Sequence, residues 1–157
     1  MAQFASGTPN TFTPTASTTT LNSWVLTTLT VGQMAQVKMF NWGGDTTTST
    51  AYVTRWARVS NTAVTPTALL IGNTGSTTVT PQASCNTYAT PATGTADNNL
   101  YKQAWNLLGG GGGIVLPIGG EWTIVGGALG TLFNQIGCGN ITGADANASS
   151  YGLQWAE

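Results

Sequence analysis

Residues 50–60 read TAYVTRWARVS, a run in which large and small side chains alternate. In an extended strand, successive side chains point to opposite faces. The run therefore places its even-numbered residues, among them Tyr52 and Trp56, on one face and its odd-numbered residues on the other. Because β-branched and aromatic residues favour pleated surfaces, the run predicts a strand with one face packed against a core.

The rest of the chain repeats this pattern in short segments that end at turn residues. Threonine supplies 29 of the 157 residues, and Val, Trp and Tyr lie between clusters of Gly, Pro, Asn and Asp. Such spacing predicts an all-β fold, a single β-sandwich or jelly-roll-like domain. Residues 36–42 are expected to place Val37 and Met39 on one face and Phe40 and Trp42 on the other. The expected strands are residues 23–31, 36–42, 50–60, 77–82, 100–108, 113–116, 121–125, 129–136 and 151–155.

The first twenty residues differ from the remainder of the chain because they carry no charge and contain Pro9 and Pro14. Proline prevents a continuous helix and favours extended chain. We therefore divide the chain into an extended N-terminal arm, residues 1–20, and a sandwich domain, residues 21–157. Phe4 and Phe12 are the candidate assembly contacts on this arm. A frayed end without a partner is the alternative interpretation.

Charge is unusually scarce in this sequence. Four Lys and Arg and five Asp and Glu give a net charge of −1, and 6% of residues are charged, against about a quarter in ordinary soluble domains. No long-range repulsion keeps copies apart, which favours a homo-oligomer or larger assembly over a monomer that neutral side chains keep in solution. Four dispersed basic residues form no phosphate-binding patch, so a nucleic-acid partner is not expected.

The residues that enzymes use are also scarce. The chain has no His, which excludes a histidine base and histidine metal ligands. Cys85 and Cys138 lack the spacing of a metal site and are either free thiols or, if their Cα atoms lie within about 7 Å, a disulfide. Glu121 is expected to be a turn residue that pairs with Arg55, Arg58 or Lys102; the alternative is a glycosidase acid. We expect no catalytic residue, no metal, no cofactor and no enzymatic activity.

Two segments and one residue type have alternative interpretations. Residues 109–113 are five glycines without the Lys or Ser/Thr of a phosphate loop, which favours a turn. Residues 114–133 are mostly apolar, but Pro117 and Glu121 favour two buried strands over a membrane span. The six tryptophans are expected in the core or a subunit interface, and a sugar-stacking platform is the alternative.

Three segments together resemble a known group of proteins. They are Arg55–Ser60 (RWARVS), Thr65–Leu69 (TPTAL) and Gly119–Ile124 (GGEWTI), and they come after a threonine-rich start. In this order they resemble small virion proteins encoded among the head genes of tailed bacteriophages. The resemblance implies a capsid decoration or cement protein on the outer surface of the virion, often a homotrimer, with the major capsid protein as its partner. A carbohydrate-binding fibre or adhesin module is the alternative function.

Overall fold

The computed structural model describes most of the chain as strands and turns. The residues described are 1–7, 24–28, 30–44, 49, 51–60, 67–75, 78–87, 95–106, 108–127, 135–142 and 149–157. Within these ranges there is no helix, so the predicted all-β class is confirmed.

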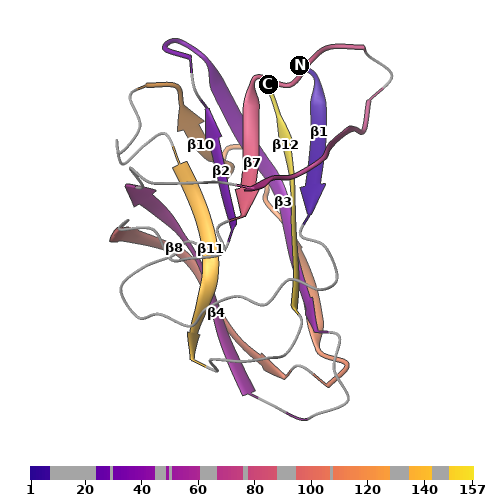
Figure 1. Ribbon diagram of the computed structural model, residues 1–157, viewed down its shortest axis with the longest axis vertical. Coiled ribbons are helices and arrows are strands. Elements are labelled where there is room, and N and C mark those ends of the chain that lie inside the picture. Colours follow the sequence, from indigo (N-terminus) through magenta and orange to yellow (C-terminus); the bar gives the residue numbers. More distant parts are fainter. Residues whose placement is uncertain are drawn as a thin grey trace.

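The strands form two antiparallel sheets that pack face to face (Figure 1). In the first sheet, sheet A, the order is β10-β3-β12-β1-β6, and β9 also pairs with β3; in the second, sheet B, it is β5-β7-β2-β11-β4-β8. This arrangement is a β-sandwich. The strands are β1 (Gln3–Gly7), β2 (Trp24–Thr28), β3 (Met34–Gly44), β4 (Ala51–Ser60), β5 (Thr67–Ala68), β6 (Ile71–Asn73), β7 (Ala83–Thr87), β8 (Thr95–Asn106), β9 (Gly111–Val115), β10 (Trp122–Val125), β11 (Gln135–Thr142) and β12 (Ser149–Ala156).

The core lies between the two sheets and is rich in aromatic rings. Trp56 of β4 is 1% exposed and has its ring centroid 5.3 Å from that of Phe40 of β3 and 6.3 Å from that of Tyr151 of β12. β4 thus buries its even-numbered face, as its alternation predicts. Contacts between rings from opposite sheets add to the stabilisation from buried area, so this cluster joins the two layers.

β3 departs from simple alternation. In β3, Trp155 pairs with Val37 while Gln154 pairs with Met39, so Lys38 is an extra residue in a β-bulge. A bulge shifts the side chains beyond it by one position. Val37 and Phe40 are therefore both buried on the core side. The prediction that Val37 shares a face with Met39, opposite Phe40, was wrong because composition does not reveal the bulge.

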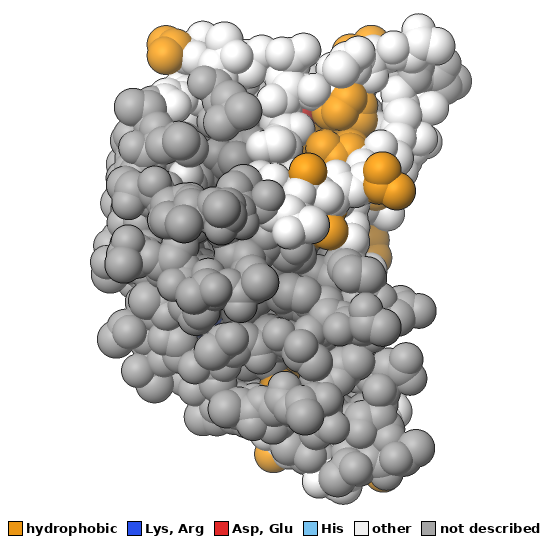
Figure 2. Space-filling view, viewed as in Figure 1, with side chains coloured by type: hydrophobic (Ala, Val, Ile, Leu, Met, Phe, Trp, Pro, Cys, Tyr) orange, Lys and Arg blue, Asp and Glu red, His pale blue; other side chains and the backbone are white. Residues whose placement is uncertain are grey.

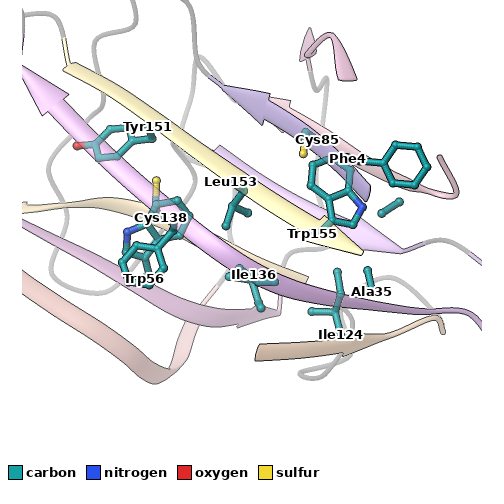
Figure 3. Packing of buried hydrophobic residues seen from close by; sticks show 13 residues of the cluster. Phe4, Ala35, Trp56, Cys85, Ile124, Ile136, Cys138, Tyr151, Leu153 and Trp155 are labelled. Atoms are coloured by element: carbon teal, nitrogen blue, oxygen red, sulfur yellow. The ribbon is translucent and has the colours of Figure 1, made fainter. Parts of the chain in front are cut away.

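The start of the chain also differs from the prediction. β1 pairs with β12 on one side and β6 on the other, so residues 3–7 belong to the sandwich and not to an arm. Phe4 is fully buried, with its ring 5.8 Å from that of Trp155 (Figure 3). It is a core residue of its own chain, which contradicts its expected role as an assembly contact. Phe12 and residues 8–20 lie outside the described residues.

The glycine run forms a turn and then a strand. Leu108 and Gly109 make the turn, where Gly109 has a φ of +64°, and β9 starts at Gly111. A Cβ on Gly112 would lie 2.9 Å from the indole of Trp42, its partner on β3. The run therefore gives Trp42 room to lie against the neighbouring strand. The expectation that residues 109–113 form only a turn was wrong, because the last three of them belong to β9.

Most other strands match the prediction, with shifted ends. The exception is the expected strand at residues 77–82: its described residues 78–82 are not a strand, and β7 begins at Ala83 instead. The short strands β5 and β6 were not predicted. For residues 129–136, only the last two lie within the described part, and both are in β11.

Candidate assembly surface

Exposed aliphatic side chains line one edge of sheet A. β9 and β10 pair in succession with β3, on the side of β3 away from β12. The turn between them presents Ile118, which is 100% exposed, and β9 ends at Val115, which is 72% exposed. Met34 and its partner Val125 are about half exposed on the outer face. We call these four residues the β3-edge surface.

One ion pair, between Lys38 and Glu121, lies next to the β3-edge surface, at the turn that presents Ile118. Lys38, at the bulge of β3, donates through Nζ to Glu121 Oε1 over 2.8 Å. Glu121 Oε2 accepts from the backbone N–H of Gly119, closing the turn. The hydrogen bond from Lys38 lowers the pKa of Glu121, so the carboxylate is ionised at neutral pH. Glu121 is thus a paired turn residue, as predicted, but its partner is Lys38 and not Arg55, Arg58 or Lys102.

A shallow hollow of about 200 Å³ lies on sheet A, over strands on the other side of β3 from β9 and β10. It extends over β1, β3 and β12, with glycine or alanine at Ala5, Gly7 and Gly152. Asn41 and Gln154, both exposed, contribute amide groups to its lining. Among the described residues that line the hollow, none is charged, so it suits a neutral polar ligand or a polypeptide segment.

Hydrophobic side chains also gather elsewhere on the molecule. The segment between β5 and β7 crosses the upper right of Figure 1, and Figure 2 shows exposed hydrophobic side chains in the same region. Its residues Leu70 and Val79 are 94% and 53% exposed. This second area provides a comparison for tests of the β3-edge surface.

The tryptophans whose side chains are described pack within the sandwich. Trp56 and Trp155 are buried, and Trp42 and Trp122 are partly buried against the core. Trp105 donates its indole N–H to Thr54 Oγ1 over 2.8 Å. None of these five rings is an exposed stacking platform, so the expectation of core tryptophans is confirmed for this set.

The two cysteines are free and buried in sheet B. β2 lies between their strands, β7 and β11, and Figure 3 shows Cys85 near Phe4 and Cys138 near Trp56, well apart in the cluster. Burial raises the pKa of Cys85 to about 12 and raises that of Cys138 as well. A protonated, buried thiol is a poor nucleophile. The disulfide alternative is excluded in this structure.

The raised thiol pKa values predict a loss of stability at alkaline pH. The folded chain keeps both thiols protonated, whereas the unfolded chain ionises them above about pH 8.5. The free energy of unfolding is therefore unaffected by the thiols below that pH. It falls as the pH rises from there toward the folded-state pKa values. At pH 9.5 the loss should be about 1.4 kcal/mol per thiol. Urea unfolding at pH 7.5 and 9.5 should show a smaller pH effect in the double variant Cys85→Ala, Cys138→Ala; an equal effect would contradict this origin.

Within the described ranges, no group of three or more Cys, Asp or Glu side chains is placed to hold a metal ion. The same part of the chain contains no helix that is long and apolar enough to cross a membrane.

Comparison with known proteins identifies no relative. No family model matches the chain, and no curated protein and no solved structure matches it either.

Proposed function

We propose that this chain is a structural subunit of a bacteriophage particle, which binds the outside of the capsid and joins neighbouring capsomers. The observation that carries the proposal is the β3-edge surface, four exposed apolar residues on β3, β9, β10 and the turn between β9 and β10, with one internally neutralised ion pair at the same turn. Clustered exposed apolar residues are typical of protein interfaces. The bacteriophage setting rests on the sequence resemblance of residues 55–60, 65–69 and 119–124.

The physical mechanism of attachment is burial of aliphatic area without a charge barrier. Each of these side chains, when covered by a partner, contributes on the order of 1.5–3 kcal/mol. Because Lys38 and Glu121 satisfy one another, a partner does not need to supply a matching charge at this surface. Within the described part of the chain, β9 and β10 pair only with β3, so their other sides could accept a strand from a neighbour.

Self-association gives the first test. At micromolar concentration, sedimentation velocity should show an oligomer, expected as a trimer, rather than the 16.1 kDa chain. Ile118→Asp should weaken this association and capsid binding at least tenfold, because it introduces a charge into a surface that buries aliphatic area. The fold should be unchanged because Ile118 is fully exposed.

A matched control is Leu70→Asp, which introduces the same charge at a similarly exposed residue on a different segment. It should leave association unchanged. A monomer that also fails to bind capsids would contradict the proposal, and equal effects of the two variants would exclude the β3-edge surface as the contact.

The hollow beside β12 favours a second candidate, a carbohydrate-binding fibre or adhesin module. Asn41 and Gln154 present neutral amides at its lining, and amides are common hydrogen-bonding partners in small-molecule sites. Glycan binding that is lost in Asn41→Ala, with thermal stability unchanged, would favour this function over capsid attachment.

A further inference from the structure

β9 lies at an edge of sheet A and, within the described part of the chain, pairs only with β3. Two hydrogen bonds show which of its backbone groups face β3. Leu116 donates its N–H to the carbonyl of Lys38 over 2.8 Å, and the carbonyl of Gly110 accepts from the N–H of Gly44 over 3.0 Å. In an antiparallel pair, residues that bond to the neighbouring strand alternate with residues whose N–H and C=O point the other way.

This alternation leaves three residues of β9 with backbone groups directed away from β3. They are Gly111, Gly113 and Val115, and all three are exposed, so this part of the edge is open to solvent. Glycine inside a strand often marks a position where another backbone approaches closely. The free side of β9 therefore presents unpaired backbone groups with little side-chain obstruction.

The other described edge strands are less suited to pairing with another strand. Natural edge strands avoid such pairing through short length, charged side chains and irregular geometry. β5, β6 and β10 have two, three and four residues. β8 contains Asp97 and Lys102 and has two register shifts against β4. β9 keeps one register with β3 over all five of its residues, and residues 103–120 contain no charge.

We propose that β9 pairs antiparallel with β9 of a second copy of this chain, about a two-fold axis at Gly113. The three residues with outward backbone groups are symmetric about Gly113. Gly111 of each copy therefore meets Val115 of the other, and the two Gly113 residues meet one another. Each of these pairs exchanges two backbone hydrogen bonds, so the outward groups of both copies are satisfied at once.

The side chains of the two copies are complementary in size in this register. Residues directly opposite one another share a face of the sheet. On the outer face Val115 lies opposite Gly111, and on the core face Ile114 lies opposite Gly112. A Cβ on Gly112 would lie 2.9 Å from the indole of Trp42, so the indole extends over this glycine and faces Ile114 of the second copy. Each aliphatic side chain thus meets a glycine and not another large side chain.

The charge distribution also favours a second copy as the occupant. A two-fold axis brings identical residues together, so a charge on β9 would repel its own copy. β9 contains none, and Glu121, the first charged residue after it, is paired with Lys38. Beyond the strand ends, the same register brings Ile118 toward Leu108 of the second copy. These residues are 100% and 53% exposed in the single chain.

The contact covers part of the β3-edge surface, and it rests on the proposed function in one respect: the second copy is a neighbouring subunit of the assembly. Two-fold pairing joins two chains, so the isolated chain should be a dimer through β9. The trimer expected from the sequence resemblance would need a different surface.

The first test uses the residue at the two-fold axis. The Cα atoms of a hydrogen-bonded antiparallel pair are about 5.5 Å apart, which a disulfide can span. Gly113→Cys should therefore give a covalent dimer under mild oxidation at micromolar concentration. The closest contact of a Cβ at this position is the terminal methyl of Met39, at 3.3 Å, and this flexible side chain can move aside.

Val115→Cys is the matched control for the cross-link. The two Val115 residues are four positions out of register, roughly 14 Å apart, so this variant should stay uncross-linked. The wild-type chain should as well, because Cys85 and Cys138 are buried. Equal cross-linking of the two variants, or cross-linking of neither, would overturn the pairing.

The second test separates backbone pairing from burial of aliphatic area. Val115→Pro removes an N–H that points away from β3, so the pairing within the chain is kept. It should weaken the dimer at least tenfold, because the hydrogen bond to Gly111 is lost twice in a two-fold contact. Val115→Thr keeps the N–H and the branched shape, and should change the dimer dissociation constant by less than about threefold. Equal losses in the two variants, at unchanged melting temperature, would exclude a backbone contact.

Capsid binding distinguishes this inference from the proposed function. A wild-type chain that sediments as the 16.1 kDa monomer but loses capsid binding in Val115→Pro would show that β9 receives a strand of the capsid, which overturns the second copy as the occupant. A trimer that Val115→Pro leaves unchanged would also overturn it. A dimer that depends on β9 but does not bind capsids would support the pairing and contradict the proposed function.

Discussion

Deletion of residues 1–7 is expected to abolish cooperative folding of the chain. β1 lies between β12 and β6, so its removal leaves both neighbours with unpaired backbone groups. It also removes Phe4 from the core and uncovers Trp155. Buried backbone groups without partners and a lost aromatic contact together exceed what a marginally stable domain tolerates.

A point variant measures the side-chain part of this effect. Phe4→Ala should lower the free energy of unfolding by about 3–5 kcal/mol, out of a total of roughly 5–15 kcal/mol for a typical domain. Gln3→Ala is the matched control in the same strand, because Gln3 is exposed, and should change stability by less than about 0.5 kcal/mol. Urea unfolding followed by tryptophan fluorescence measures both. A cooperative transition at the wild-type midpoint in the deletion variant would show that β1 is dispensable.

The sequence predicts strands where alternation is long and local. β4 illustrates this, since its alternation identifies both the strand and the face that packs on the core. β1 was missed because it is five residues long and its pairing partners lie near residues 72 and 154. The local sequence pattern does not reveal which distant segments pair with a strand. In addition, an uncharged start with Pro9 and Pro14 is equally typical of a free arm.

The same limit applies to the candidate surface. The sequence predicts that Glu121 is a paired turn residue, but Lys38, its partner, is 83 positions away and reaches it because β10 pairs with β3. Val115 and Ile118 are exposed because β9 and β10 lie at the edge of sheet A. Buried strands and edge strands have similar composition, so only the strand order reveals that these side chains face outward.

Trp56→Ala is the second variant with a large expected effect, and it separates a structural role of the tryptophans from a sugar-binding one. Trp56 contacts rings of sheet A and is 1% exposed. Its truncation should lower the free energy of unfolding by about 3–5 kcal/mol, without a specific effect on glycan binding. The matched control is Asn41→Ala at the exposed hollow, which should change stability by less than about 0.5 kcal/mol.

Chemical unfolding and a glycan array are applied to the wild-type chain, Trp56→Ala and Asn41→Ala. Together they decide between a structural and a sugar-binding role of the tryptophans. If the tryptophans are structural, the array is blank for the wild-type chain and only Trp56→Ala loses stability. If Trp56→Ala instead keeps its melting temperature and loses binding to a glycan, the ring forms part of a sugar site. Trp56 would then not be a core residue of the sandwich. Because Trp56 is enclosed by Phe40, Tyr151 and Trp122, we expect the first outcome.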